Sequence, residues 1–326
     1  MRKLTAVFAA CALAFFIPAC GGDDDNGDGG SGSAGSEKQV TIGMANFTLA
    51  APYFAGMTEA VEASARERGG VKVVSTDANG DAAKLTSDVE DLVARGVDGI
   101  IISAGPLESA PAALNSAEQA DIPVVLVDRK LTGDNYTSWI GPDNETIGRQ
   151  DGEYLAKLLG GKGKVVIIRG GPADNTIGLA RTEGMLSGLE GTDIETVKAP
   201  EFGEWGTDGG QKVMEDVLAK SQDIDAVFCE NDSMCLGAQK AIRDAGRSDD
   251  IVIAGVDGQK EALKAILDGT NYVVTGRNDS GQIGSEGFKR LMAILDGEEV
   301  EKDTILPSPQ ITKDNAKEHY DPNSIF

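Results

Sequence analysis

The sequence is poor in several residue types on which common functions depend. Its 326 residues include one histidine, His319, and only four cysteines. The cysteine spacing is not that of a zinc site, so we expect no metal and no other cofactor. Basic residues are also outnumbered, with 30 Lys and Arg against 53 Asp and Glu. Because contacts to phosphates need a basic face, we do not expect nucleic acid as a partner.

Motifs of common enzyme classes are absent as well. There is no G-x-S-x-G and no P-loop, and no G-x-G-x-x-G follows an expected strand. Carboxylates are numerous, but no spacing singles out a pair as general acid and base. We therefore do not expect an enzyme.

No apolar run is long enough to span a bilayer, which needs ~20 residues. A basic start and a shorter apolar run, residues 2–17, precede small residues at 19–20. This pattern predicts a secretion signal over residues 1–19. "IPAC", residues 17–20, resembles a bacterial lipobox, in which Cys20 would be acylated after cleavage. A plain signal peptide with a chance cysteine is the alternative.

Residues 20–38 are dominated by Gly, Ser and Asp and cannot bury a core, so they predict a lipidated flexible linker. The protein would then be exported and held at the membrane through a lipid anchor, in the periplasm or on the outer face of the cell membrane. Loss of residues 1–19 removes two bases and no acid, and changes the net charge from −23 to −25. We interpret this acidity first as solubility.

From residue 39 onward, apolar runs of strand length alternate with amphipathic stretches. Residues 81–95 and 207–219 have their apolar side chains on one helical face, and Asp81 is an expected N-cap. Such alternation predicts βαβ units and parallel sheets covered on both faces. Strands are expected at 40–46, 71–77, 99–104, 123–128, 164–170, 194–199, 226–231, 251–257 and 272–278.

The alternation is too long for one sheet of ordinary width, so we expect two α/β lobes. Chain crossings between them are expected near 140–144, 276–278 and 306–310. No continuous linker separates the lobes, which indicates several short passes.

Polar side chains follow most of the expected strands. Ligands of open parallel sheets bind outside the carboxyl ends of the strands. Helix capping is the alternative, above all for Asp77, Asp232 and Asp279. Because Asp, Asn and Arg cluster at so many strand ends, we favour a binding site for hydroxyl groups. Tyr53, Phe54 and Trp205 could offer apolar faces to a sugar ring, unless they pack into the core.

Seven stretches together resemble the ribose-type periplasmic sugar-binding proteins, the type I solute-binding lipoproteins of ABC importers. They lie between about residues 40 and 310 and read APYFAGMTEAVEASARERG, DLVARGVDGIII, IPVVLVDRK, ARTEGM, FCENDSMCLGAQKAI, VIAGVDG and GQIG. The resemblance implies a Venus-flytrap fold, two Rossmann-like lobes joined by a three-strand hinge. The lobes would be 39–141 plus 277–307 and 142–276 plus 308–326. A small carbohydrate or polyol would bind between them and pass to ABC permease subunits.

The resemblance also implies the ligand-binding residues. They are Tyr53, Phe54, Asp128, Arg129, Arg181, Trp205, Asn231, Asp257 and Arg277. Ribose binders have Asn where this chain has Ala51, Gln where it has Arg277, and Phe where it has Val256. A pentose, a polyol or a sugar acid therefore remains open. Three arginines against two acids favour an anionic or partly oxidised ligand.

Two alternatives keep the fold and change the role. The protein could present its ligand to a membrane sensor, which the sequence does not distinguish from transport. A regulator of the lactose-repressor type would need an N-terminal helix-turn-helix and a basic face, and we set it aside.

Cys229 and Cys235 could form a disulfide. Since one is expected in a strand and the other in a helix, we favour two buried free thiols.

Overall fold

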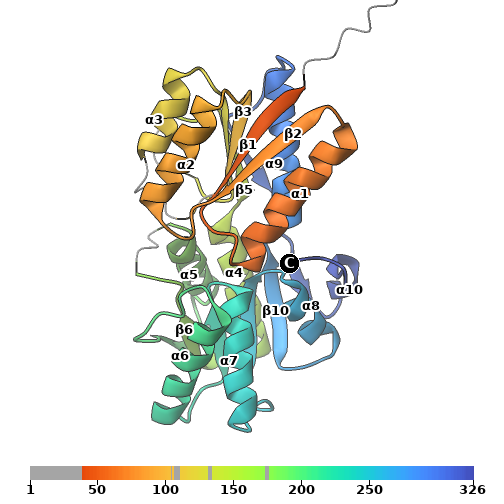
Figure 1. Ribbon diagram of the computed structural model, residues 1–326. Coiled ribbons are helices and arrows are strands. Elements are labelled where there is room, and N and C mark those ends of the chain that lie inside the picture. Colours follow the sequence, from red (N-terminus) through yellow and green to blue (C-terminus); the bar gives the residue numbers. More distant parts are fainter. Residues whose placement is uncertain (1–38, 104, 106–110, 131–133, 173–175) are drawn as a thin grey trace, which may run out of the picture. The chain divides into compact units, whose positions relative to one another are not determined.

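The structure is a computed structural model, and it describes residues 39–326 except 104, 106–110, 131–133 and 173–175. The expected signal peptide, the linker and Cys20 lie outside the described residues. Within the described part of the chain, the strands form two six-stranded sheets, each with helices on both faces (Figure 1).

The first sheet has the strand order β11-β5-β4-β3-β1-β2, and every pair is parallel. Its strands are β1 (Val40–Asn46), β2 (Val71–Asp77), β3 (Gly99–Ser103), β4 (Val124–Val127), β5 (Ser138–Pro142) and β11 (Asp303–Leu306). One face packs on α1 (Pro52–Arg68) and α9 (Ser280–Leu295), and the other on α2 (Ala82–Ala94) and α3 (Pro111–Gln119).

The centre of this sheet shows why its strands are continuously apolar. Ile100 and Ile102 pack with the residues of α2 and α3, whereas Ile101 packs with those of α1 and α9. Successive side chains of a strand point to opposite faces, and here both faces are covered. All three isoleucines are fully buried.

The second sheet has the order β12-β10-β9-β8-β6-β7 and is parallel except for β12, which runs antiparallel to β10. Its strands are β6 (Lys162–Ile168), β7 (Asp193–Lys198), β8 (Ala226–Cys229), β9 (Val252–Asp257), β10 (Tyr272–Arg277) and β12 (Gln310–Thr312). The helices α4 (Asn144–Leu158) and α5 (Ile177–Gly188) pack on one face. The other face is covered by α6 (Thr207–Lys220), α7 (Asp232–Asp244) and α8 (Lys260–Leu267), and α10 (Ala316–His319) lies on α8.

The chain changes sheet at three places: between β5 and α4, between β10 and α9, and between β11 and β12. Two α/β sheets connected in this way confirm the expected fold class, with β12 as the one antiparallel exception. The sequence did not indicate β5, β11 or β12 as strands. These strands contain three to five residues each, and β5 ends in a Gly-Pro pair that resembles a turn.

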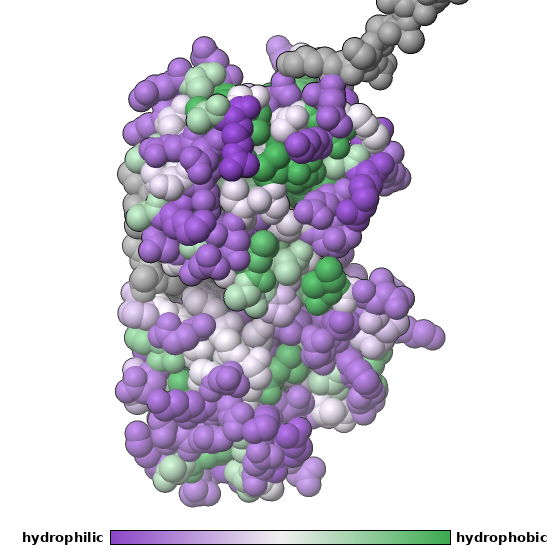
Figure 2. Space-filling model, viewed as in Figure 1, coloured by the Kyte–Doolittle hydropathy of each residue, from purple (hydrophilic) through white to green (hydrophobic). Residues whose placement is uncertain are grey.

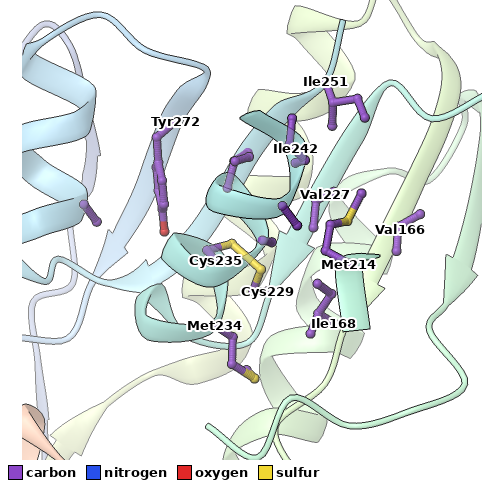
Figure 3. Packing of buried hydrophobic residues seen from close by; sticks show 14 of the residues in the cluster. Val166, Ile168, Met214, Val227, Cys229, Met234, Cys235, Ile242, Ile251 and Tyr272 are labelled. Atoms are coloured by element: carbon purple, nitrogen blue, oxygen red, sulfur yellow. A yellow bond between two sulfur atoms is a disulfide. The ribbon is translucent and has the colours of Figure 1, made fainter. Parts of the chain in front are cut away.

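The preference for free thiols is wrong, because Cys229 and Cys235 form a disulfide. Cys229 ends β8 and Cys235 lies in the first turn of α7, and their Cα atoms are 5.4 Å apart. A strand end and the following helix start can come this close, since only five residues separate the cysteines. Both are fully buried in the apolar cluster between the sheet and α7 (Figure 3).

Helix capping is partly as expected. Asp81 caps α2 and Asp279 caps α9, each accepting hydrogen bonds from backbone N–H groups of the first turn. Asp232 is not a cap, because Asn231 caps α7. Asp77 is not a helix cap either, since it accepts from the N–H groups of Leu49 and Asn79 in a loop.

Polar and charged side chains cover most of the face in view in Figure 2. Among the described residues, the large apolar side chains that are exposed are Leu158, Leu179, Val197, Ile305 and Ile325. No helix in the described ranges is both long enough and apolar enough to span a bilayer.

Candidate functional site

Three polar side chains at the carboxyl ends of strands meet across the two sheets. Asp128 follows β4 of the first sheet, Asp257 ends β9 of the second, and Asn278 follows β10. The Nδ2 group of Asn278 donates to Oδ1 of Asp128 and to Oδ1 of Asp257, both at 3.3 Å. One amide therefore bridges carboxylates that belong to different sheets, and all three side chains are buried.

Tyr53 extends this network on the side of the first sheet. It stands in the first turn of α1, which begins with Pro52 at a position where the missing N–H costs nothing. Its hydroxyl donates to Oδ1 of Asp128 at 2.8 Å. Burial, and then the charge of Asp128, raise the pKa of Tyr53 well above its ordinary value. The phenol therefore stays protonated and acts as a donor.

Arg181 of α5 extends the network on the side of the second sheet. Its Nη2 lies 3.1 Å from Oδ1 of Asp257. Its Nε donates to Oδ1 of Asn144 at 2.8 Å, and its Nη1 donates to the carbonyl of Glu230 at 2.6 Å. The planar guanidinium is thus held in one orientation by three partners, one of which is the carboxyl group of Asp257.

The carboxyl group of Asp257 lies in a strongly desolvated environment. Burial raises the pKa of Asp257 to about 8, while Arg181 and the hydrogen bond from Asn278 oppose the rise and Asp232 and Asp128 add to it. A carboxyl group with such a pKa can accept a hydrogen bond when ionised and donate one when protonated.

The backbone is strained at this edge of the sheets. Asp128 has φ 68° and Asp257 has φ 126°, and the neighbouring Glu204 and Trp205 have φ 50° and 58°. Residues with side chains rarely adopt such values, and strain of this kind concentrates at functional sites. The strain therefore marks the strand ends as candidates for binding.

Trp205 lies at the same edge, against the end of β6. A Cβ atom on Gly170 would come within 2.0 Å of the indole, so the ring rests directly on the glycine backbone. Asn231 donates its amide to the carbonyl of Trp205 at 3.1 Å while its Oδ1 caps α7. Asn231 therefore ties the tryptophan loop to the start of α7.

Arg129 makes a second contact between residues of the two halves of the chain. It follows Asp128, is buried, and donates from Nη1 to the hydroxyl of Thr176, the residue that precedes α5. Phe54 contacts Tyr53 edge-on, with ring centroids 5.5 Å apart.

Arg277 is placed differently from the other expected residues. Its Nη2 lies 2.6 Å from Oδ2 of Asp279, and among the described residues no hydrogen bond or ion pair joins it to Asp128 or Asp257. Burial, and then the charge of Arg277, lower the pKa of His319, which lies toward the C-terminal end of the chain. Asn278, and not Arg277, joins the network.

Sequence reasoning missed Asn278, Asn144 and Glu230 as members of the site. Glu230 is buried and accepts from the N–H of Gly170 and the hydroxyl of Thr182, both at 2.6 Å. Asn278 and Glu230 stand at strand ends, where the sequence does indicate polar groups. Asn144 begins α4 and carried no such signal.

Among the described residues, no three His, Cys, Asp or Glu side chains gather as a metal site would need.

The architecture is that of a type I periplasmic binding protein. It consists of two α/β sheets with three crossings, and buried polar strand ends are joined across the sheets.

Comparisons with known proteins agree with this class. Residues 42–299 match the family described as periplasmic binding protein domain. The ribose import binding protein of Bacillus subtilis is 32% identical over 309 residues, which cover 94% of this chain and 98% of that protein. The chain belongs to the periplasmic binding protein family, and within it to the ribose-type sugar-binding proteins of ABC transporters.

Two solved structures of ABC transporter solute-binding proteins are also similar. One is from Mycobacterium smegmatis with bound glycerol, at 30% identity and a TM-score of 0.81, covering 87% of this chain and 98% of that one. The other is from Bacillus halodurans with bound myo-inositol, at 30% identity, a TM-score of 0.80 and the same coverage. The relatives are binding proteins and not enzymes, and the family is extracytoplasmic.

Proposed function

We propose that the chain is a lipid-anchored solute-binding protein that captures a small, uncharged polyhydroxylated compound between two lobes and delivers it to an ABC importer. The observation that carries this proposal is the bridge from Asn278 to Asp128 and Asp257. Each bond in it joins a donor to an acceptor, and a ligand hydroxyl can do both. Hydroxyls can therefore replace these bonds without leaving a buried polar group unpaired.

The charges of the site favour a neutral ligand over an anionic one. The preference for an anion depended on three arginines, but Arg277 pairs with Asp279, and Arg181 already binds Asp257, Asn144 and the carbonyl of Glu230. Asp128 and Arg129 are a further acid and base at the same strand end. A carboxylate on the ligand would lie close to Asp128 and would have to displace the present partners of Arg181. The ribose, glycerol and myo-inositol of the relatives are all uncharged.

The proposed lobes are residues 39–141 plus 277–307 and residues 142–276 plus 308–326. The first supplies Tyr53, Phe54, Asp128 and Arg129, and the second supplies Arg181, Trp205, Asn231 and Asp257, with Asn278 at a crossing. Support comes from the sheets to which the flanking strands belong. A ligand that contacts both lobes favours the closed state by the difference in its affinity for the two states.

Anchoring through Cys20 and delivery to permease subunits complete the proposal. Both depend on the signal and lipobox pattern of residues 1–20 and on membership of the ABC transporter family. Metabolic labelling with a fatty-acid analogue tests the anchor, since C20A would then lose the label.

The substitution D128A tests the site. We expect D-ribose, myo-inositol or glycerol to raise the melting temperature of the wild-type protein, and D-gluconate to raise it less. D128A removes the acceptor of both Tyr53 and Asn278, so we expect it to lose this stabilisation while remaining folded without ligand. D249N is the control, because Asp249 is exposed and precedes β9, at the opposite end of that strand from Asp257. Unchanged ligand affinity in D128A would refute the site.

A further inference from the structure

The last residue of the sequence packs against a proposed ligand residue. Phe326 is 9% exposed, and its ring lies edge-on to that of Tyr53, with centroids 5.3 Å apart and an angle of 82° between the planes. A contact of this geometry is favourable for two aromatic rings. The other end of the same Tyr53 ring carries the hydroxyl that donates to Asp128.

The space for Phe326 depends on a glycine. Gly56 lies one turn after Pro52 in α1, and a Cβ atom there would stand 3.1 Å from Cβ of Phe326 and 2.8 Å from Oγ of Ser280. Any side chain at this position would push against the phenylalanine or against the start of α9. The surface of α1 is therefore shaped to receive Phe326.

The segment that ends in Phe326 comes from the second sheet. It follows β12 and α10, and α10 packs on α8. Lys260, the first residue of α8, donates from Nζ to the carbonyl of Ser324, and the Ser324 hydroxyl accepts from the N–H of Phe326 at 3.2 Å. Residues 324–326 are thus fixed to α8 at one end and to α1 at the other.

A pocket of about 370 Å³ adjoins this segment. Its lining includes Glu59 of α1, Lys260 of α8, His319 and Phe326. The charged side chains Glu59 and Lys260 already bind Arg66 and Ser324, which gives no reason to assign a ligand to the pocket. Because the pocket lies between α1 and the start of α8, residues 324–326 bridge the two helices beside it.

We propose that Phe326 is a positioning residue for ligand binding, which holds Tyr53 so that its hydroxyl reaches Asp128. This inference rests on the proposed function, in which Tyr53 contacts the ligand. Through Lys260 and Ser324, the position of the Tyr53 ring is coupled to α8 of the second sheet. Residues 324–326 therefore link closure of the hinge to the orientation of Tyr53, a proposed ligand-binding side chain.

The test compares F326A with I325A, a matched truncation of a side chain that is 51% exposed. Without ligand, we expect F326A to increase hydrogen exchange of the amides of residues 53–58, and I325A to leave it unchanged. Calorimetry then measures the affinity for D-ribose, myo-inositol and glycerol. For each of these compounds that binds the wild-type protein, we expect F326A to lose affinity about tenfold and F326L to recover it.

A second variant separates positioning from general loss of structure. Y53F lacks the hydroxyl that Phe326 is proposed to position, so adding F326A to Y53F should reduce affinity by much less than it does in the wild type. Equal losses in both backgrounds would contradict positioning, and so would unchanged exchange at residues 53–58 in F326A. Failure of all three probes to bind the wild-type protein would count against the proposed function, and the exchange result would still decide the role of Phe326.

Discussion

Asp128 and Asp257 adopt backbone conformations that cost on the order of 1–3 kcal/mol each. The contacts that they make explain why such conformations persist. With φ 68° and 126°, the two strand ends place their carboxylates within reach of one amide, that of Asn278. At the scale of the residue, the centre of the site is a pair of strained positions whose carboxyl groups are bridged by one amide.

The pH dependence of stability tests the environment of Asp257. Its pKa is about 8 in the folded protein against an ordinary 3.8, so between these values the folded state holds a proton that the unfolded state has lost. Raising the pH through this range therefore lowers the free energy of unfolding, by at most about 1.4 kcal/mol per pH unit for one group. D257N removes this titration, and we expect its stability to vary less with pH.

Urea unfolding at pH 5, 6.5 and 8 without ligand measures this difference. Burial also raises the pKa of Asp232, to about 6, and that of Asp151 well above its ordinary value, so the wild-type slope has further contributors, which D257N leaves in place. D249N serves as the control for loss of one surface charge. Parallel curves for the wild type and D257N would show that Asp257 is ionised throughout this range.

The residue scale is also where prediction from the sequence was weakest. Asp128 and Asp257 stand out because buried strands end at them. Arg277 was expected in the site because the resemblance to ribose binders implies a ligand-binding residue at that position. Consecutive residues of a strand point to opposite sides, and here Asn278 is the one that joins the network. Asn231 and Asp232 are a similar case. Which of two adjacent polar residues caps the helix depends on where β8 ends, and the sequence placed that end two residues late.

At the scale of the element, close packing of α4 on α5 places Arg181. Gly148 and Gly152 of α4 face Gly184 and Gly188 of α5, and a Cβ atom at any of the four would come within 2.0–2.3 Å of a backbone carbonyl oxygen. Helices approach this closely only where side chains are absent. The result is that Asn144, at the start of α4, accepts a hydrogen bond from Arg181.

The substitution G148A tests this arrangement. Its Cβ would lie 2.0 Å from the carbonyl oxygen of Arg181, so α5 has to move. We expect a loss of about 1–3 kcal/mol in the free energy of unfolding, together with weaker binding of D-ribose or myo-inositol.

G281A is a suitable control for G148A, because a Cβ there would meet only the carboxylate of Asp279, at 3.2 Å. Chemical denaturation and calorimetry of both variants measure the two effects. Wild-type stability and affinity in G148A would mean that the helices have room to adjust.

Most elements could be predicted from the sequence because their patterns are long and local. The fully apolar run of β3 and the Asp81 cap of α2 need no tertiary information. The strands β11 and β12 have four and three residues, with partly exposed patterns, and they exist because neighbouring strands provide partners. The contact of Phe326 with Tyr53 joins residues 273 positions apart, and no local pattern reveals it.

At the scale of the molecule, two sheets of the same build are joined by three passes of the chain, and their polar strand ends meet at the proposed site. The number of strands and their order of appearance predicted two lobes. A crossing was expected at 306–310, and β11 and β12 do lie in different sheets. The sequence could not predict which side chains meet, since that depends on how the two sheets face each other.

The most direct test of the central claim is a crystal structure of the protein grown with D-ribose or with myo-inositol. We expect ligand hydroxyls within hydrogen-bond distance of Asp128, Asp257 and Arg181 at once, with the carboxylate–amide bridge of Asn278 replaced by bonds to the ligand. A ligand bound to one sheet alone, or bound elsewhere while that bridge stays intact, would contradict the account.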